Sequence, residues 1–220
     1  GDLTWNIFDH TQNPTELIDF VRGAEISTKD GGLTTIDTIA RSSVENFNYA
    51  FGIQLNHETL DIEYNDLARA EFDSDGKITK TADLFFLGGG QNVAESRNKY
   101  GVFFEGEQEF FERLGLTVAA RYEKVDNFSS LDPKISLRFN PSDQITLRIS
   151  RGTSFTMPSM GQMFSSDINL GSVRDLDNNI FVRQARIGNP DLKPATSTNS
   201  NFGFIYDSDI NRFSLDYWKI

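Results

Sequence analysis

Two aspartates and a glycine at residues 73–76 (DSDG) match the first half of a calcium-binding loop, in which oxygen ligands alternate along the chain. The later ligands and the closing glutamate do not follow in the sequence, so a plain turn is the simpler interpretation. The two histidines, His10 and His57, are too few and too far apart to predict a metal cluster, and the chain has no cysteine. We therefore expect neither a metal nor a cofactor.

The remaining polar residues offer little support for catalysis. The glycine triplet at 88–90 lacks the lysine and hydroxyl residue of a phosphate-binding loop, which favours a loop or the entry to a strand. The serines include no G-x-S-x-G motif. A hydrolase that uses Asp73, Asp75 and Asp83 is one hypothesis, but no paired-carboxylate motif supports it. The sequence therefore predicts a protein that is not an enzyme.

Two sets of side chains are better suited to meet a solute. Apolar residues in two long polar inserts, 63–97 and 154–196, could contact a ligand or simply pack loop against loop. They are Phe85, Phe86, Met157, Met160, Met163 and Phe164. Charged residues on the polar side of predicted strands could form a charge ladder facing a lumen, or only make that side wettable. They are Glu105, Glu107, Arg121, Glu123, Arg138 and Arg148.

A hairpin at residues 131–153 is the clearest element that could position such side chains. Ile135 and Leu137 alternate with Ser136 and Arg138, and the same pattern continues through 145–150. A period of two predicts β-strands, and residues 141–143 (PSD) have turn chemistry. One face of the hairpin must therefore meet an apolar environment, and the other must meet water.

The same alternation predicts about eight strands of roughly ten residues, the length of a tilted strand that crosses a membrane. They cover 33–44, 46–62, 98–107, 114–125, 131–140, 144–153, 197–207 and 212–220. Residues 1–32 are predicted to be irregular, with one short helix that starts at 13–16 (NPTE) and a turn at 29–32 (KDGG).

The links between these strands alternate in length. Short links near 45, 109, 142 and 209 alternate with the two long inserts, and only 126–130 departs from the pattern. Short turns at one end and long loops at the other are typical of a transmembrane β-barrel, whereas a soluble β-sandwich is the alternative that also explains alternation. Aromatic residues near the strand ends fit interfacial girdles: Tyr49, Phe110, Phe111, Tyr122, Tyr217 and Trp218. Trp5, like Trp218, is interpreted as a packing or interfacial residue.

Composition excludes other classes. The formal net charge of −11 and the absence of a basic patch argue against nucleic-acid binding. No run approaches the roughly 18 apolar residues of a membrane helix. The first residues, GDLTWNIFDH, lack the basic and apolar regions of a signal peptide, so a mature protein or a fragment is expected.

Several stretches resemble the TonB-dependent outer-membrane receptors. Residues 131–148 resemble the family's recurring hairpin, residues 154–159 (SFTMPS) its "GFRAPS" box with a Gln-aromatic element at 162–164, and residues 189–194 (NPDLKP) its "NP-x-LKPE" box. The glycine triplet through Tyr100 is similar to a glycine-led strand entry. The resemblance runs from about residue 84 to 220, and more loosely over 1–62.

The resemblance has departures. Ser154, Thr156 and Met157 stand where the first box usually has Gly, Arg and Ala, and Ala195 stands where the second usually has Glu. If those residues form structural salt bridges in relatives, this chain does without them.

The resemblance implies an all-β fold: an antiparallel up-and-down transmembrane β-barrel segment of about eight strands, with long external loops and short periplasmic turns. Residues 1–220 would be part of one barrel domain of the roughly 22-stranded plugged kind, and the plug and signal peptide would lie outside the sequence. The implied function is TonB-energised transport, across the outer membrane of a Gram-negative bacterium, of a scarce solute such as a siderophore, cobalamin or oligosaccharide. The implied partners are outer-membrane lipid and the TonB complex, engaged through the missing plug, and the complete barrel would be monomeric. A complete small barrel with a structural or adhesin role is the alternative.

Overall fold

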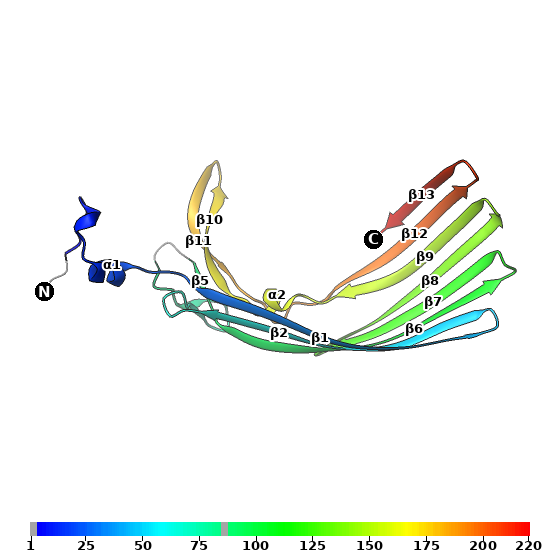
Figure 1. Ribbon diagram of the computed structural model, residues 1–220, viewed down its shortest axis with the longest axis horizontal. Coiled ribbons are helices and arrows are strands. Elements are labelled where there is room, and N and C mark those ends of the chain that lie inside the picture. Colours follow the sequence, from blue (N-terminus) through cyan, green and yellow to red (C-terminus); the bar gives the residue numbers. More distant parts are fainter. Residues whose placement is uncertain (1–3, 85–87) are drawn as a thin grey trace. The chain divides into compact units, whose positions relative to one another are not determined.

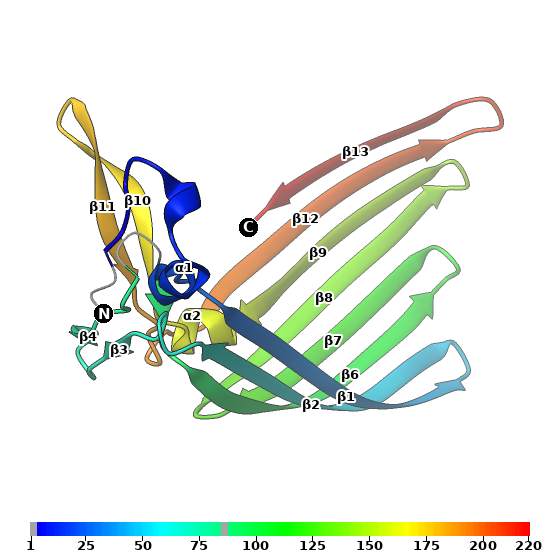
Figure 2. The ribbon, with the colours of Figure 1, turned by 60° about the vertical axis from the view of Figure 1, so that its left-hand side comes forward.

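The computed structural model describes residues 4–84 and 88–220. Its main element is an antiparallel sheet of eight strands that follow one another in sequence order (Figure 1). The strands are β1 (Ser27–Val44), β2 (Phe47–Tyr64), β6 (Val93–Phe110), β7 (Leu114–Val125), β8 (Phe128–Ser142), β9 (Ile145–Thr156), β12 (Ala195–Asp207) and β13 (Arg212–Lys219). Strands β1 and β13 are the two edges (Figure 2), so the sheet is not closed, and the alternative of a complete eight-stranded barrel is wrong for the described residues.

The chain divides into two compact units. The sheet unit comprises Gly31–Leu60, Glu95–Met163 and Asp191–Ile220. The loop unit comprises the described parts of Gly1–Asp30, Asp61–Ala94 and Phe164–Pro190. The division separates most of the eight-stranded sheet from most of the inserts that the sequence predicts as loops.

The predicted strands are confirmed, and several are longer than expected. Strand β7 begins and ends where the alternation predicts, whereas β1, β2 and β6 each have 18 residues. The predicted turn at 29–32 is wrong, because β1 passes through both glycines and pairs with β2 along the sheet edge. Strand pairing here overrides the local turn preference of Asp-Gly-Gly.

The hairpin of β8 and β9 turns later than predicted. Asp143 and Gln144 form the turn, and Pro141 lies inside β8 at a break in the pairing register between Phe139 and Ser142. Proline cannot donate a hydrogen bond to a neighbouring strand, so a bulge is the position where a strand tolerates it. The other short links are residues 45–46, 111–113 and 208–211. They alternate with the long links 65–92 and 157–194, as predicted, and residues 126–127 are the exception.

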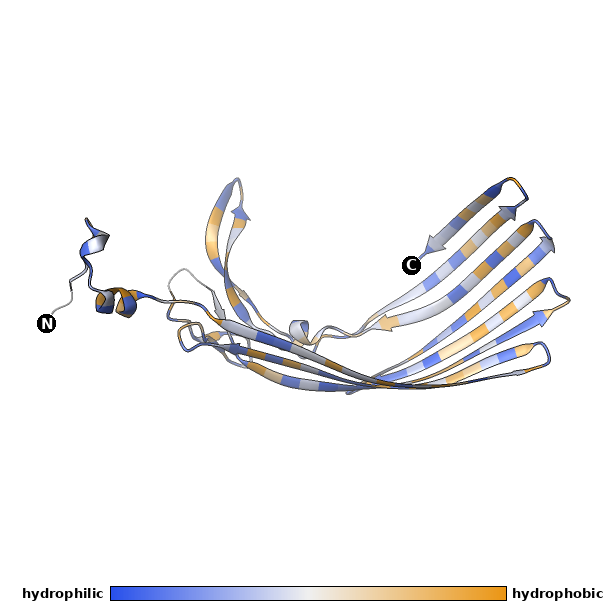
Figure 3. Ribbon diagram, viewed as in Figure 1, coloured by the Kyte–Doolittle hydropathy of each residue, from blue (hydrophilic) through white to orange (hydrophobic). Residues whose placement is uncertain are grey.

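Pairing between strands aligns side chains of one kind on each face. Leu116 of β7 lies opposite Leu137 of β8, and Leu137 lies opposite Ile149 of β9. Figure 3 shows the resulting bands of apolar and polar residues along the strands. A slip of one residue in any pair would reverse the faces of that strand.

The apolar face of the sheet is exposed rather than covered. Phe51, Ile135 and Ile149 are 47%, 49% and 53% exposed. In a β-sandwich these side chains would pack into a dry core against a second sheet. The β-sandwich alternative is therefore wrong for this part of the chain.

Most buried apolar side chains lie instead in the loop unit. They include Leu17 of helix α1 (Thr15–Val21), Ile62, Ala68, Ala70 and Ile168. The predicted helix start at 13–16 is confirmed, with a short 3-10 helix, η1 (His10–Gln12), before it. The loop unit therefore has a small core of its own.

The long inserts contain strands that the sequence did not predict. These are β3 (Glu71–Phe72), β4 (Ile78–Lys80), β5 (Gly89–Gly90), β10 (Asp167–Asp175) and β11 (Asn178–Arg186), and helix α2 (Met160–Phe164) precedes β10. Strands β10 and β11 form a hairpin, and β10 also pairs with β5 along its other edge. The glycine triplet thus enters a strand, and a side chain at Gly90 would overlap the ring of Tyr64.

The aromatic residues near the strand ends lie in three kinds of place: on the apolar face, in a turn and on the polar face. Tyr122 lies opposite Leu131, and Tyr217 lies opposite Phe202, so both are on the apolar face. Phe111 lies in a turn and is 92% exposed. Trp218 lies opposite Asn201 and points to the polar face, away from the face that carries Tyr217, because adjacent residues of a strand point to opposite faces.

A close contact between β2 and β6 provides a test of the pairing. A methyl group at Gly52 would overlap the ring of Phe103, so we expect Gly52→Ala to lower the free energy of unfolding by about 1–3 kcal/mol in a urea titration. Gly31→Ala on β1 is the matched control, because no atom lies within 4 Å of the added methyl group. Phe103→Ala should remove most of the effect of Gly52→Ala, and equal effects of the two glycine variants would contradict this packing.

Candidate functional site

A continuous network of charged and polar side chains crosses the polar face of β1, β2, β6 and β7. Arg121 Nε donates to Glu123 Oε2 at 2.8 Å, and Arg121 Nη2 donates to Gln54 Oε1 at 2.6 Å. Gln54 Nε2 in turn donates to Asp37 Oδ1 at 2.7 Å. Side chains therefore link β7 to β2 across the intervening strand β6, and link β2 to its neighbour β1.

The network continues through Lys99 toward the start of β6. Lys99 Nζ lies 3.4 Å from Glu123 Oε1 and 4.0 Å from Glu58 Oε1. Glu58 Oε2 also accepts from Arg97, whose Nε is 3.0 Å away. Three cations and three carboxylates, with Gln54 between them, thus share one face of the sheet. Arg97 and Glu123 are only 5% and 8% exposed, and such buried charges are stable only when they are paired.

Arg97 also reaches a segment beyond the sheet strands. Its Nη1 donates to the carbonyl oxygen of Pro158 at 2.9 Å and lies 3.7 Å from Sδ of Met163. Because a guanidinium donates toward this sulfur, Met163 is oriented toward a cation of the protein itself. The adjacent residues Met157 and Met160 line a cavity of about 620 Å³, together with Phe155, Lys99 and Glu123.

A second polar cluster lies on the same face between β6 and β13. Arg138 Nη2 donates to Glu109 Oε1 at 2.6 Å, and Arg148 Nη2 donates to Asp216 Oδ1 at 2.7 Å. Trp218 and Glu107 line a cavity of about 750 Å³ with Arg138, Arg148 and Asp216. This cluster combines charge pairs with one aromatic surface.

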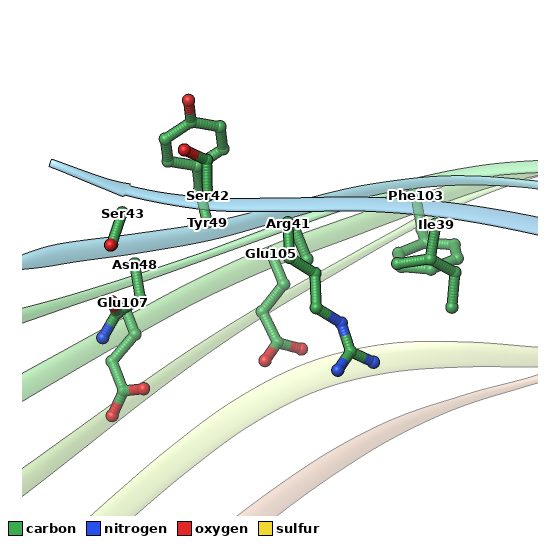
Figure 4. Close-up of a pocket in the computed structure, with 10 residues that line it drawn as sticks. Ile39, Arg41, Ser42, Ser43, Asn48, Tyr49, Phe103, Glu105 and Glu107 are labelled. Carbon is green, nitrogen blue, oxygen red and sulfur yellow. The ribbon is translucent and has the colours of Figure 1, made fainter.

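The close-up in Figure 4 shows a third hollow, formed by β1, β2 and β6. Arg41, Glu105, Glu107 and Asn48 project to one side of the strands, whereas Tyr49 and Ser42 project to the other (Figure 4). The alternation of faces therefore holds at the β1 edge as well.

The structure brings together most of the predicted polar residues. Arg121 and Glu123 pair with each other, whereas Arg138 and Arg148 pair with Glu109 and Asp216, two partners that the sequence did not single out. Sequence reasoning also missed Glu58, Arg97 and Lys99. Their parity within β2 and β6 could have identified them, but the predicted start of the strand at residue 98 excluded Arg97.

The predicted ligand contacts differ in exposure. Met160 and Met163 are 7% and 5% exposed, whereas Met157 and Phe164 are half-buried. Phe85 and Phe86 lie outside the described residues. Met157 and Met160 are the members of this set that line the cavity with Lys99.

The motifs that suggested metal chemistry have structural roles. Asp73 Oδ1 accepts from the backbone nitrogens of Asp75 and Lys77, which closes the turn between β3 and β4. His57 Nδ1 lies 2.8 Å from Asn98 Oδ1 on the next strand. Among the described residues, no group of three histidine, aspartate or glutamate side chains could hold a metal ion.

None of the helices in the described part of the chain is long and apolar enough to cross a membrane.

A family model described as "TonB dependent receptor-like, beta-barrel" matches residues 2–220. The chain therefore belongs to the TonB-dependent receptor β-barrel family, as the sequence resemblance indicated. No curated protein sequence matches the chain.

Solved structures of the same fold include receptors and a transporter. A variant of the ferric enterobactin receptor PfeA from Pseudomonas aeruginosa has a TM-score of 0.63 and 18% identity, over 86% of this chain and 26% of that one. The siderophore receptor PirA from Pseudomonas aeruginosa has a TM-score of 0.60 and 12% identity, over 87% of this chain and 32% of that one. The copper transporter OprC has a TM-score of 0.60 and 16% identity, over 88% and 30%. The chain thus spans about a quarter to a third of the length of these structures.

The burial of the network predicts unequal effects of two similar substitutions. Glu123→Gln should lower the free energy of unfolding by about 2 kcal/mol or more, because it removes the carboxylate that pairs with both Arg121 and Lys99. Glu109→Gln should cost no more than about 1 kcal/mol, because both side chains of that pair are about half exposed. Urea unfolding of the two variants compares them, and equal losses would contradict the role of burial.

Proposed function

We propose that this chain is part of the barrel wall and external loops of an outer-membrane receptor, and that the receptor imports a scarce solute with energy from TonB. The chain belongs to this receptor family and forms an eight-stranded sheet. The observation that carries the proposal is that the apolar face of this sheet is exposed while its polar face holds a network of paired charges. In a membrane, strands must satisfy their backbone groups by pairing, and only a closed barrel leaves no free edge. The two free edges, β1 and β13, then pair with further strands of one domain that includes residues 1–220.

The two faces of the sheet have different partners in this proposal. The apolar face contacts lipid, and the face with Glu105, Glu107, Arg121, Glu123, Arg138 and Arg148 lines the lumen. The barrel acts as a monomer and engages TonB through its plug. The wall performs no bond chemistry, because its task is to hold the external loops and a wettable passage.

The proposed solute class follows from the fold neighbours. Two of them are a ferric enterobactin receptor and a siderophore receptor, and a third is a copper transporter. A metal chelate is therefore the first candidate, ahead of cobalamin or an oligosaccharide. Met157 and Phe164 are the described loop residues proposed to contact it, with Phe85, Phe86, Met160 and Met163 as the further candidates.

Uptake in a strain that lacks the parent gene tests the proposal. The panel is ferric enterobactin, copper ions, cyanocobalamin and a maltodextrin, each supplied at limiting concentration. We expect the deletion to abolish high-affinity uptake of one panel member, and we expect the restored gene to need TonB and a proton-motive force. Unchanged uptake of every panel member, or uptake that persists without TonB, would contradict the proposal.

A further inference from the structure

Arg97 is the buried side chain that joins the sheet to the segment after β9. It lies on β6, and its side chain is 6% exposed. Both Nε and Nη2 donate to Oε2 of Glu58 on the adjacent strand β2. The remaining nitrogen, Nη1, points to the carbonyl oxygen of Pro158 and the sulfur of Met163. One guanidinium therefore connects three parts of the sheet unit that are far apart in sequence.

The segment that Arg97 contacts, residues 157–163, has local hydrogen bonds of its own. The backbone nitrogen of Met163 donates to the carbonyl oxygen of Ser159 at 3.1 Å, and Gln162 Oε1 accepts from the nitrogen of Ser159 at 2.9 Å. These bonds shape the first turn of α2 but do not attach it to the wall. Residue 156, directly before this segment, is a threonine, and the guanidinium that reaches the segment comes from Arg97 on strand β6.

We propose that Arg97 is a positioning residue that clamps residues 157–163 onto β6, and so fixes the side of the cavity lined by Met157 and Met160. Glu58 holds the guanidinium plane, and the donor that remains free of Glu58 holds the carbonyl of Pro158. Arginine suits this role because its planar fork donates to two acceptors in fixed directions, which a lysine ammonium on a flexible stem does not reproduce. This inference rests on the proposed function for its meaning in uptake, but its structural part does not.

The clamp determines the geometry of the cavity above Lys99 and Glu123. Met157 and Met160 line that cavity, and Pro158 lies between them in sequence. Release of the Pro158 carbonyl would free the segment while the ladder of β6 with β7 stays intact. Residues 157–163 would then be mobile, and solute binding would be weaker because it would have to order this segment first.

Two variants separate the clamp from the ion pair. Arg97→Lys keeps a positive charge for Glu58 but loses the second, directed donor. The double variant Arg97→Met with Glu58→Gln removes the clamp without leaving an unpaired carboxylate. Arg113→Met is the matched control, because Arg113 lies in the turn between β6 and β7 and its Nη1 also donates to a proline carbonyl oxygen, that of Pro141, at 2.8 Å.

Hydrogen exchange in the full-length protein, purified from outer membranes, is the direct measurement. In both Arg97 variants we expect the backbone amides of residues 157 and 159–163, that of Met163 above all, to exchange at least about tenfold faster. The reason is that a hydrogen bond from a charged donor changes the equilibrium constant for local opening by about tenfold or more. The amides of β6 and β7 should keep their protection. In the Arg113→Met control, residues 157–163 should exchange as in the unmodified protein. Unchanged exchange at 157–163 in both Arg97 variants would overturn the clamp.

Uptake kinetics then test the positioning role. For the panel member that the unmodified receptor imports, both Arg97 variants should raise KM on the order of tenfold with little change in the maximal rate, and the control should not. Faster exchange with an unchanged KM would overturn the positioning role. Faster exchange in a protein that imports no panel member would support the clamp and contradict the proposed function, so the two failures are distinguishable.

Discussion

The rest of this structure depends on one constraint: apolar and polar side chains alternate along each strand, and the strands pair in a register that keeps side chains of one kind on the same face. Each strand places apolar and polar side chains on opposite faces, and the pairing keeps every strand in step, as Leu116, Leu137 and Ile149 show across three strands. One face of the sheet therefore carries an apolar band that crosses β2, β6, β7, β8, β9, β12 and β13, and the other face is mostly polar. Because a slip of a single residue would exchange the faces of a strand, the cross-strand charge pairs and the apolar face both depend on the same register.

The polar face carries charges that would be costly if they were unpaired. Arg97 and Glu123 are nearly buried: Arg97 pairs with Glu58 of the adjacent strand, and Glu123 pairs with Arg121 of its own strand and Lys99 of the adjacent one. Burial lowers the local dielectric, so a complete network is rigid and an incomplete one is destabilising. A rigid wall is what a receptor needs to hold loops of defined shape, and Arg97 extends that rigidity from the wall to the segment 157–163.

Local alternation was sufficient to predict the strands, as the match for β7 shows. It failed where pairing overrides local preference: residues 29–32 contain turn-forming glycines, yet they continue β1 along β2. It also failed in the inserts, where β10 and β11 are a hairpin with little regular alternation. Parity alone could have placed Trp218 and Asp216 on the polar face. The contact of Arg97 with Pro158 could not be predicted, because 61 residues separate the partners and no local pattern records their proximity.

The central claim is that the apolar face contacts lipid and the polar face contacts water. The sequence has no cysteine, so a single nitroxide label can be placed by Leu137→Cys or by Ser136→Cys, with any cysteine elsewhere in the full-length protein replaced by serine. In liposomes, electron paramagnetic resonance compares collisions of the label with oxygen, which concentrates among acyl chains, and with a nickel chelate, which stays in water. We expect collisions with oxygen to dominate for the label at residue 137 and collisions with the nickel chelate to dominate for the label at residue 136. Equal accessibility at the two positions, or the reverse order, would contradict the central claim.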